Sequence, residues 1–161
     1  MSGPALALAL DLDGVLGDTR QLWRDWLEDA SRRFGSIAPL AAGALPEDRV
    51  VAARELDRWA EGGVGDWRAA LERFADERAP LYLRPDAGVS AALRRLGAAG
   101  ARLGAYTDAP AGLARVAVAH LGVERRLEAV ESGDGARERL LAGLGDGVQV
   151  VESREHFLRL A

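Results

Sequence analysis

Two aspartates one residue apart follow an apolar run near the start of the chain. Asp11 and Asp13 stand in the stretch ALDLDG (residues 9–14), directly after alternating Ala and Leu residues. A carboxylate at the edge of a buried segment is costly unless a metal, a hydrogen-bond network or a charged ligand compensates it. Residues two apart on an extended chain point the same way, so both carboxylates are expected to face one site. Capping a single helix does not need two carboxylates, so the pair favours a functional role.

Polar residues also follow each later apolar stretch that we interpret as a strand. Strands are predicted over residues 102–106, 127–130 and 148–151. They run into Thr107–Asp108, into residues 131–137 with Arg137 at their end, and into Glu152–Ser153. In open parallel α/β sheets, ligands bind at the carboxyl ends of the strands, so the sequence predicts one site at these ends. Asp108 and Ser153 are interpreted more simply, as residues that end a strand or cap the next helix.

A site of this kind requires a parallel sheet to position it. Residues 5–10 are interpreted as the first strand, because six apolar residues between Pro4 and Asp11 suit a buried parallel strand better than a helix. From Pro85 onward, amphipathic helical patterns alternate with the three later strands. This alternation predicts the α/β class, with a Rossmann-like parallel sheet and helices on both of its faces.

Residues 18–84 follow a different pattern. Apolar residues at helical spacing recur in three stretches, which begin near Trp23, after Pro46 and after Asp66. All four tryptophans of the protein fall in this part of the chain. We interpret residues 18–84 as a small helical subdomain with its own aromatic core, inserted after the first strand. Residues 1–17 and 85–161 would then form the α/β core.

Composition narrows the class of protein. The chain has 161 residues, 48% of them hydrophobic, which is enough for a packed core. It has no cysteine, so disulfides and thiolate metal sites are excluded. A net charge of −4 gives no support for binding to nucleic acid or an anionic membrane. The first apolar run lacks the basic flank of a signal peptide and is too short to span a membrane. We expect a cytoplasmic protein that is a monomer or a homodimer.

Two of these stretches resemble the motifs of a known family. DLDGVLGDT (residues 11–19) resembles the first motif of the haloacid dehalogenase-like hydrolase superfamily, which reads D-x-D-G followed by a hydrophobic residue. GAYTD (residues 104–108) resembles the second motif, a strand that ends in Thr or Ser. The helical residues 18–84 are similar in position to a small cap inserted just after the first motif. The resemblance covers nearly the whole chain and implies that family's α/β core with a helical cap.

The resemblance implies phosphoryl chemistry on a small-molecule phosphoester. Asp11 would be the nucleophile that forms an aspartyl-phosphate. Asp13 would protonate the leaving group and then deprotonate the attacking water. The Asp11 carboxylate and the Asp13 carbonyl would help to hold Mg²⁺, and Thr107 would bind a phosphoryl oxygen. Dehalogenases of the superfamily lack an acid at the position of Asp13, which points to phosphate rather than halide.

The later motifs depart from the family pattern. All 21 basic residues of the chain are arginines, so Arg137 stands roughly where the family usually has a lysine. It is suited to binding phosphate oxygens, although a solvated arginine at a helix start is the competing interpretation. The last motif of the family reads G-D-x-x-x-D. Glu152 stands at its first Asp and would be a third metal ligand. His156 stands at its second Asp, but imidazole prefers softer metals than Mg²⁺. Candidate substrate contacts in the cap are Arg20, Arg24 and Trp67.

The sequence therefore predicts a Mg²⁺-dependent phosphatase for a small phosphorylated metabolite. Two alternatives stay open. A phosphomutase would use the same residues. A catalytically weak or inactive member, kept as a binding or regulatory module, would not need Asp11 for its activity.

Overall fold

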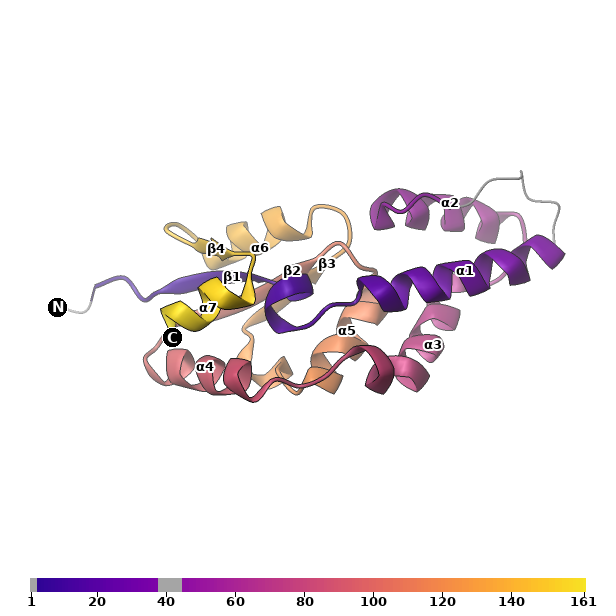
Figure 1. Ribbon diagram of the computed structural model, residues 1–161. Coiled ribbons are helices and arrows are strands. Elements are labelled where there is room, and N and C mark those ends of the chain that lie inside the picture. The colour runs from indigo at the N-terminus through magenta and orange to yellow at the C-terminus, as the bar shows by residue number, and fades with distance from the viewer. Residues whose placement is uncertain (1–2, 38–44) are drawn as a thin grey trace.

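A four-stranded parallel sheet forms the centre of the molecule. The computed structural model describes residues 3–37 and 45–161. The strands are β1 (Ala7–Asp11), β2 (Arg102–Thr107), β3 (Ala129–Ser132) and β4 (Gln149–Val151). Their order is β3-β2-β1-β4, and every neighbouring pair is parallel (Figure 1). The predicted α/β class is confirmed.

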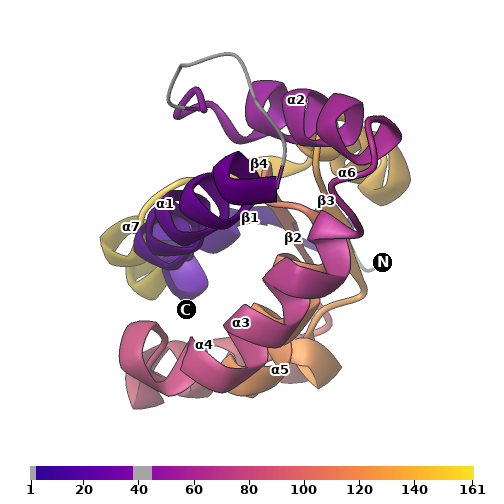
Figure 2. The ribbon, with the colours of Figure 1, turned by 90° about the vertical axis from the view of Figure 1, so that its right-hand side faces the viewer.

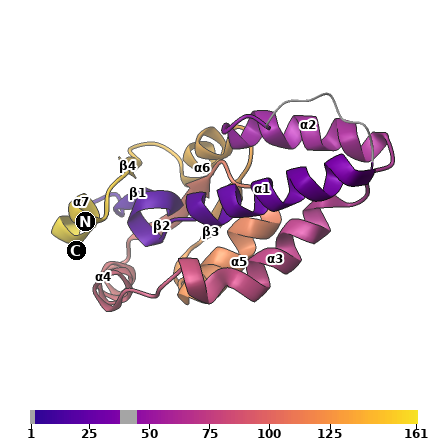
Figure 3. The same cartoon turned by 45° about the vertical axis from the view of Figure 1, so that its right-hand side comes forward.

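The helices divide between a segment after β1 and the βα units that follow. The first group is α1 (Arg20–Ile37), α2 (Arg49–Glu61) and α3 (Trp67–Tyr82). The second is α4 (Ala87–Ala98), α5 (Ala111–Leu121), α6 (Ala136–Leu144) and α7 (Arg154–Leu160). Figure 3 shows the first group extending from one end of the sheet. No helix in the described part of the chain is long and apolar enough to span a membrane.

Aspartates begin three of these helices. Asp48, Asp66 and Asp86 each accept a hydrogen bond from the backbone N–H three residues further on, at the start of α2, α3 and α4. Such a side chain satisfies one of the backbone donors that a helix leaves free at its N-terminus. The first turn of α2 is therefore fixed in place at the residue before Arg49.

The two faces of the sheet are covered differently. Helix α6 packs on one face and α4, α5 and α7 on the other, so the predicted helices on both faces are confirmed (Figure 1). Along β1, Leu8 and Leu10 point into the larger cluster, while Ala9 points toward α6. This alternation of large and small residues follows from the two-residue period of a strand. It also explains why a sequence of good helix formers is a strand here.

The tryptophans belong to the main hydrophobic core. Trp23, Trp26 and Trp67 are buried in the same cluster as Leu8 and Leu10 of the sheet. Helix α3 packs along α5, and α1 packs on α3, as Figure 2 shows from the end of the helices. The expectation that this helical part has an aromatic core of its own is therefore wrong. The subdomain boundaries at residues 17/18 and 84/85 stay an interpretation, and residues 1–2 and 38–44 lie outside the described residues.

One strand begins later than predicted. Residues 127–130 were expected as a strand, but β3 covers Ala129–Ser132. A short 3₁₀ turn at Glu124–Arg126 precedes it, and Leu127 closes that turn by donating its N–H to the Glu124 carbonyl at 3.3 Å. The shift moves Ser132 into the pairing with Thr107 and brings the following loop close to the end of β2.

Candidate active site

A cavity of about 620 Å³ lies at the carboxyl ends of β1 and β2. Four of the residues predicted from the sequence to take part in catalysis line it: Asp11, Asp13, Thr107 and Arg137. Of the predicted cap contacts, Arg20 and Arg24 of α1 also line it. Trp67 does not line this cavity, and its indole N–H instead donates to Asp57 at 2.9 Å. Residues from the ends of β1 and β2 and from the start of α6 thus meet at one sheet edge, whereas Glu152, which was also predicted to be there, does not line the cavity.

A wide turn after β1 carries Asp13 into this cavity. The turn spans Leu12–Leu16 and closes where Gly17 N–H donates to the Leu12 carbonyl at 3.0 Å. Gly14 has φ +126°, a conformation that other residues rarely adopt. A Cβ at Gly14 would also lie 3.0 Å from the Glu152 carbonyl oxygen. Glycine is therefore required here both by the backbone conformation and by the close approach of the chain after β4.

Both carboxylate oxygens of Asp13 are hydrogen-bonded. Oδ1 accepts from the backbone N–H and the hydroxyl of Thr19, each at 2.7 Å. Oδ2 accepts from the Thr107 hydroxyl at 2.8 Å and from the guanidinium of Arg49. Asp13 is only 9% exposed. Burial alone would raise its pKa, but the Arg49 charge and the Thr19 hydrogen bonds hold the pKa of Asp13 below its usual range.

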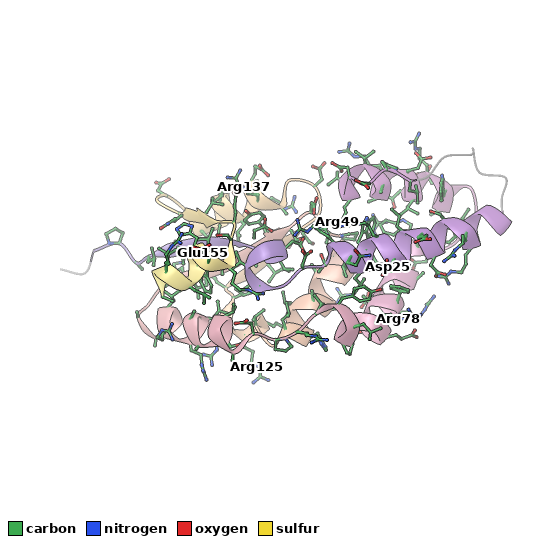
Figure 4. The ribbon with its side chains drawn as sticks, in the orientation of Figure 1. Asp25, Arg49, Arg78, Arg125, Arg137 and Glu155 are labelled. Carbon is green, nitrogen blue, oxygen red and sulfur yellow. The ribbon has the colours of Figure 1, made fainter. Side chains whose placement is uncertain are left out.

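Arg49, the first residue of α2, reaches the centre of this network. Its side chain is only 6% exposed and forms ion pairs with both Asp13 and Asp108. Nε donates to Asp108 Oδ1 at 2.8 Å, and Nη1 donates to the Thr19 hydroxyl at 2.7 Å. Figure 4 shows Arg49 where the helical segment meets the end of the sheet. A buried guanidinium costs several kcal/mol unless carboxylates compensate it, and here two do.

Asp11 ends β1 and has a different environment from Asp13. Its Oδ1 accepts the Asp13 N–H at 3.1 Å, which orients the carboxylate. Burial, followed by the nearby charge of Asp13 and that of Glu152, raises the pKa of Asp11 to about 6. The two aspartates therefore differ strongly in proton affinity although they are two residues apart. Negative charge gathers around Asp11, and a cation or a cationic side chain there would relieve it.

Arg137 and Glu152 lie at the edge of this arrangement. Arg137 is exposed at the start of α6 (Figure 4), and its positive charge acts on Tyr106. Burial, and the charges of Asp11 and Glu152, raise the pKa of Tyr106 to about 12. Glu152 is exposed after β4 and is not among the residues lining the cavity, but its charge acts on Asp11. His156 lies on α7, where its N–H donates to Ser153 at 3.2 Å.

The oxygen donors near Asp11 fit Mg²⁺. Among residues 3–37 and 45–161, no group of three acidic, His or Cys side chains is placed to hold a metal. Mg²⁺ is commonly held by only one or two carboxylates, keeping several waters, so it does not need such a group. The carboxylate of Asp11, whose pKa is raised by burial and then by neighbouring acids, offers the hard oxygen ligand that this ion prefers. Zinc, which takes nitrogen and sulfur ligands, fits this donor set poorly.

Sequence reasoning missed three members of the site. Thr19 and Arg49 were not assigned any role, and Asp108, which directly follows β2, was interpreted as a residue that ends a strand or caps the next helix. Asp108 is instead an ion-pair partner of Arg49, and α5 begins at Pro110 without a side-chain cap. The interpretation of Ser153 as a cap is confirmed at α7. Nothing in the spacing of Arg49 could identify it, because its role depends on how α2 packs across the cavity.

Comparison with solved structures gives a likeness of fold. No family model and no curated protein matches this sequence. Among solved structures, the chain is similar to a candidate beta-phosphoglucomutase from Thermotoga maritima, with 19% sequence identity and a TM-score of 0.49. The alignment covers 90% of this chain and 74% of that chain. At this identity the likeness concerns the fold alone.

Proposed function

We propose that the protein is a Mg²⁺-dependent phosphatase that acts on a small phosphorylated metabolite through an aspartyl-phosphate on Asp11. The observation that carries the proposal is the meeting of Asp11, Asp13, Thr107 and Arg137 around one cavity at the sheet edge. A cavity of about 620 Å³ has the size of a small-molecule site. Residues 18–84 would act as the cap that excludes water and contacts the rest of the substrate.

The two aspartates suit two successive steps. An oxygen of Asp11 would attack phosphorus while the bond to the leaving oxygen breaks and Asp13 gives that oxygen a proton. In the second step Asp13 would take a proton from a water whose oxygen attacks phosphorus, releasing inorganic phosphate and restoring Asp11. Arg49 and Thr19 hold the pKa of Asp13 below its usual range, so Asp13 must first give up its hydrogen bonds with Thr107 and Arg49 and take up a proton from solvent before it can protonate the leaving oxygen.

Other groups would hold the phosphoryl oxygens and the cation. Thr107 and Arg137 would donate to the phosphoryl oxygens, and arginine matches their geometry well. Asp11, the Asp13 carbonyl and Glu152 would hold Mg²⁺. The ion would neutralise phosphoryl charge as it develops in the transition state.

The test is phosphate release from a panel of small phosphoesters and an aryl phosphate, with and without Mg²⁺. We expect release that requires Mg²⁺ and is lost in Asp11→Asn. Asp146→Asn, a matched change at an exposed aspartate in the turn before β4, should leave release unchanged. Release that survives in Asp11→Asn would remove the aspartyl-phosphate mechanism. If no substrate is turned over and the protein does not bind Mg²⁺ with beryllofluoride, the binding-module alternative replaces the phosphatase.

A further inference from the structure

Helix α2 is attached to the rest of the molecule differently from α1 and α3. Helix α3 packs along α5 of the sheet layer, and α1 packs on α3. Helix α2 packs against α3, and three of its residues are buried, two of them apolar: Ala52 and Leu56. The third is Arg49, whose charge makes it an unusual core residue.

Polar contacts join α2 to the loops that follow the strands. Within the described part of the chain, the hydrogen bonds and ion pairs between α2 and these loops come from two arginines. Arg49 contacts the network of Asp13, Thr107 and Asp108. Arg54, one and a half turns later, pairs with Asp134 after β3 at 2.7 Å. The Arg54–Asp134 pair is about two-thirds exposed on both sides, whereas Arg49 and Asp13 are almost fully buried.

We propose that Arg49 is a positioning residue that latches α2 onto the core through Asp13, so that α2 alone is the moving part of the cap. The role of Asp13 as acid and base rests on the proposed function, whereas the latch itself does not. Helix α2 also supplies Ala52 and Leu56 to the shared core, but it packs on α3, whereas α3 itself packs along α5 of the sheet layer and stays in place with α1.

The physical basis is that the buried charges of Arg49 and Asp13 compensate each other. If α2 lifts, Asp13 keeps its bonds to Thr19 and Thr107 but loses the positive charge that offsets its burial. Breaking a buried ion pair is strongly unfavourable because a charge is left without compensation. The exposed Arg54 pair contributes far less, because water screens it. Closure of α2 over the cavity is therefore coupled to the position of the Asp13 carboxylate.

The test is hydrogen exchange of the amides in residues 53–61 of α2, measured by mass spectrometry on the full chain without ligand. We expect Arg49→Met and Asp13→Asn each to speed this exchange about tenfold or more. The double variant should exchange no faster than the faster single variant, because both changes break one link. Arg54→Met is the matched control on the same helix and should change exchange by less than about threefold. Arg49→Lys keeps the charge and should restore part of the protection.

Two results would overturn the latch: unchanged α2 exchange in Arg49→Met, or effects of Arg49→Met and Asp13→Asn that multiply in the double variant. If Arg49→Met does not fold, Arg49→Lys takes its place as the test. Exchange in Arg49→Lys equal to that of the native protein would show that the guanidinium geometry is not needed, and would also refute the latch. The exchange measurements need no substrate. A protein without phosphatase activity would therefore refute the proposed function and leave the test of the latch unaffected. In an active protein, Asp13 must release Arg49 for the proton transfers, but Arg49→Met should still lower kcat about tenfold with little change in KM, because α2 would close over the site less often. A raised KM with unchanged kcat would make Arg49 a substrate contact and refute the positioning role.

Discussion

Thr19→Val tests whether the buried network, rather than packing, holds the turn after β1 against the cap. The substitution replaces the hydroxyl of a fully buried residue by a methyl group of similar size. It removes the donor to Asp13 Oδ1 at 2.7 Å and the acceptor for Arg49 Nη1 at 2.7 Å. The backbone N–H of Thr19 still donates to Asp13, so the turn keeps one of its links.

The expected loss follows from the two bonds. A hydrogen bond to a charged group contributes about 1.5–3 kcal/mol, so losing two costs about 3–6 kcal/mol before any compensation. The added methyl returns about 1 kcal/mol through burial. We therefore expect the free energy of unfolding to fall by about 3 kcal/mol, a large share of the 5–15 kcal/mol of an ordinary domain. Thr19→Ser keeps the hydroxyl and loses one buried methyl, which should cost about 1 kcal/mol.

Urea unfolding at pH 7 distinguishes the hydrogen-bond network from packing, because the two explanations predict opposite orders of stability for Thr19→Val and Thr19→Ser. With a slope of about 2 kcal/mol per molar urea, the midpoint should fall by about 1.5 M in Thr19→Val and about 0.5 M in Thr19→Ser. If packing alone mattered, Val would be tolerated better than Ser, and that order would refute the reasoning. The folded pKa of Asp13 is lowered, so its contribution is present above pH 3.8 and is lost as the pH falls through the folded pKa. The difference between Thr19→Val and the native protein should therefore shrink below pH 3.8.

Three further outcomes are expected. The pKa of Asp11 is raised to about 6, so its ionisation destabilises the fold as the pH rises from 3.8 through 6. Asp11→Asn should therefore raise the urea midpoint at pH 8 without Mg²⁺ but not at pH 3.5. An equal gain at both pH values would contradict this. Gly104→Val should lower stability by about 2 kcal/mol, since even a Cβ there would lie 2.6 Å from Leu140 Cδ1 of α6, and Leu140→Ala should restore part of the loss; a thermal melt checks both. Glu152→Gln should weaken Mg²⁺ binding measured by calorimetry, whereas Glu155→Gln on the exposed side of α7 should not, and equal affinities in both variants would remove Glu152 from the metal site.

Local patterns predicted the sheet and the edge where its polar residues meet. The alternation of apolar runs with helical spacing placed β1, β2, β4 and the helices, because each pattern depends on neighbours along the chain. The convergence of Asp11 and Thr107 followed from a general rule about parallel sheets. β3 was placed two residues early, since a 3₁₀ turn has no strong signal in sequence.

Long-range contacts explain what sequence reasoning missed. Arg49 is one of 21 arginines, and its spacing within α2 gives no sign that it is buried. Its burial arises because α2 crosses the cavity opposite Asp13 and Asp108. The Trp cluster was expected to form a separate core, since its members are close in sequence. The packing of α3 on α5 joins that cluster to the sheet instead.

That joint core has a consequence for how this chain can be altered. Helices α1 and α3 supply Trp23, Trp26 and Trp67 to the same apolar interior that covers β1. Removing the helical segment, or exchanging it for that of another protein, would leave the side of α5 that packs against α3 open to water. The helical segment therefore cannot be exchanged between proteins as an independent unit. Calorimetry should record one cooperative melting transition for the whole chain rather than two.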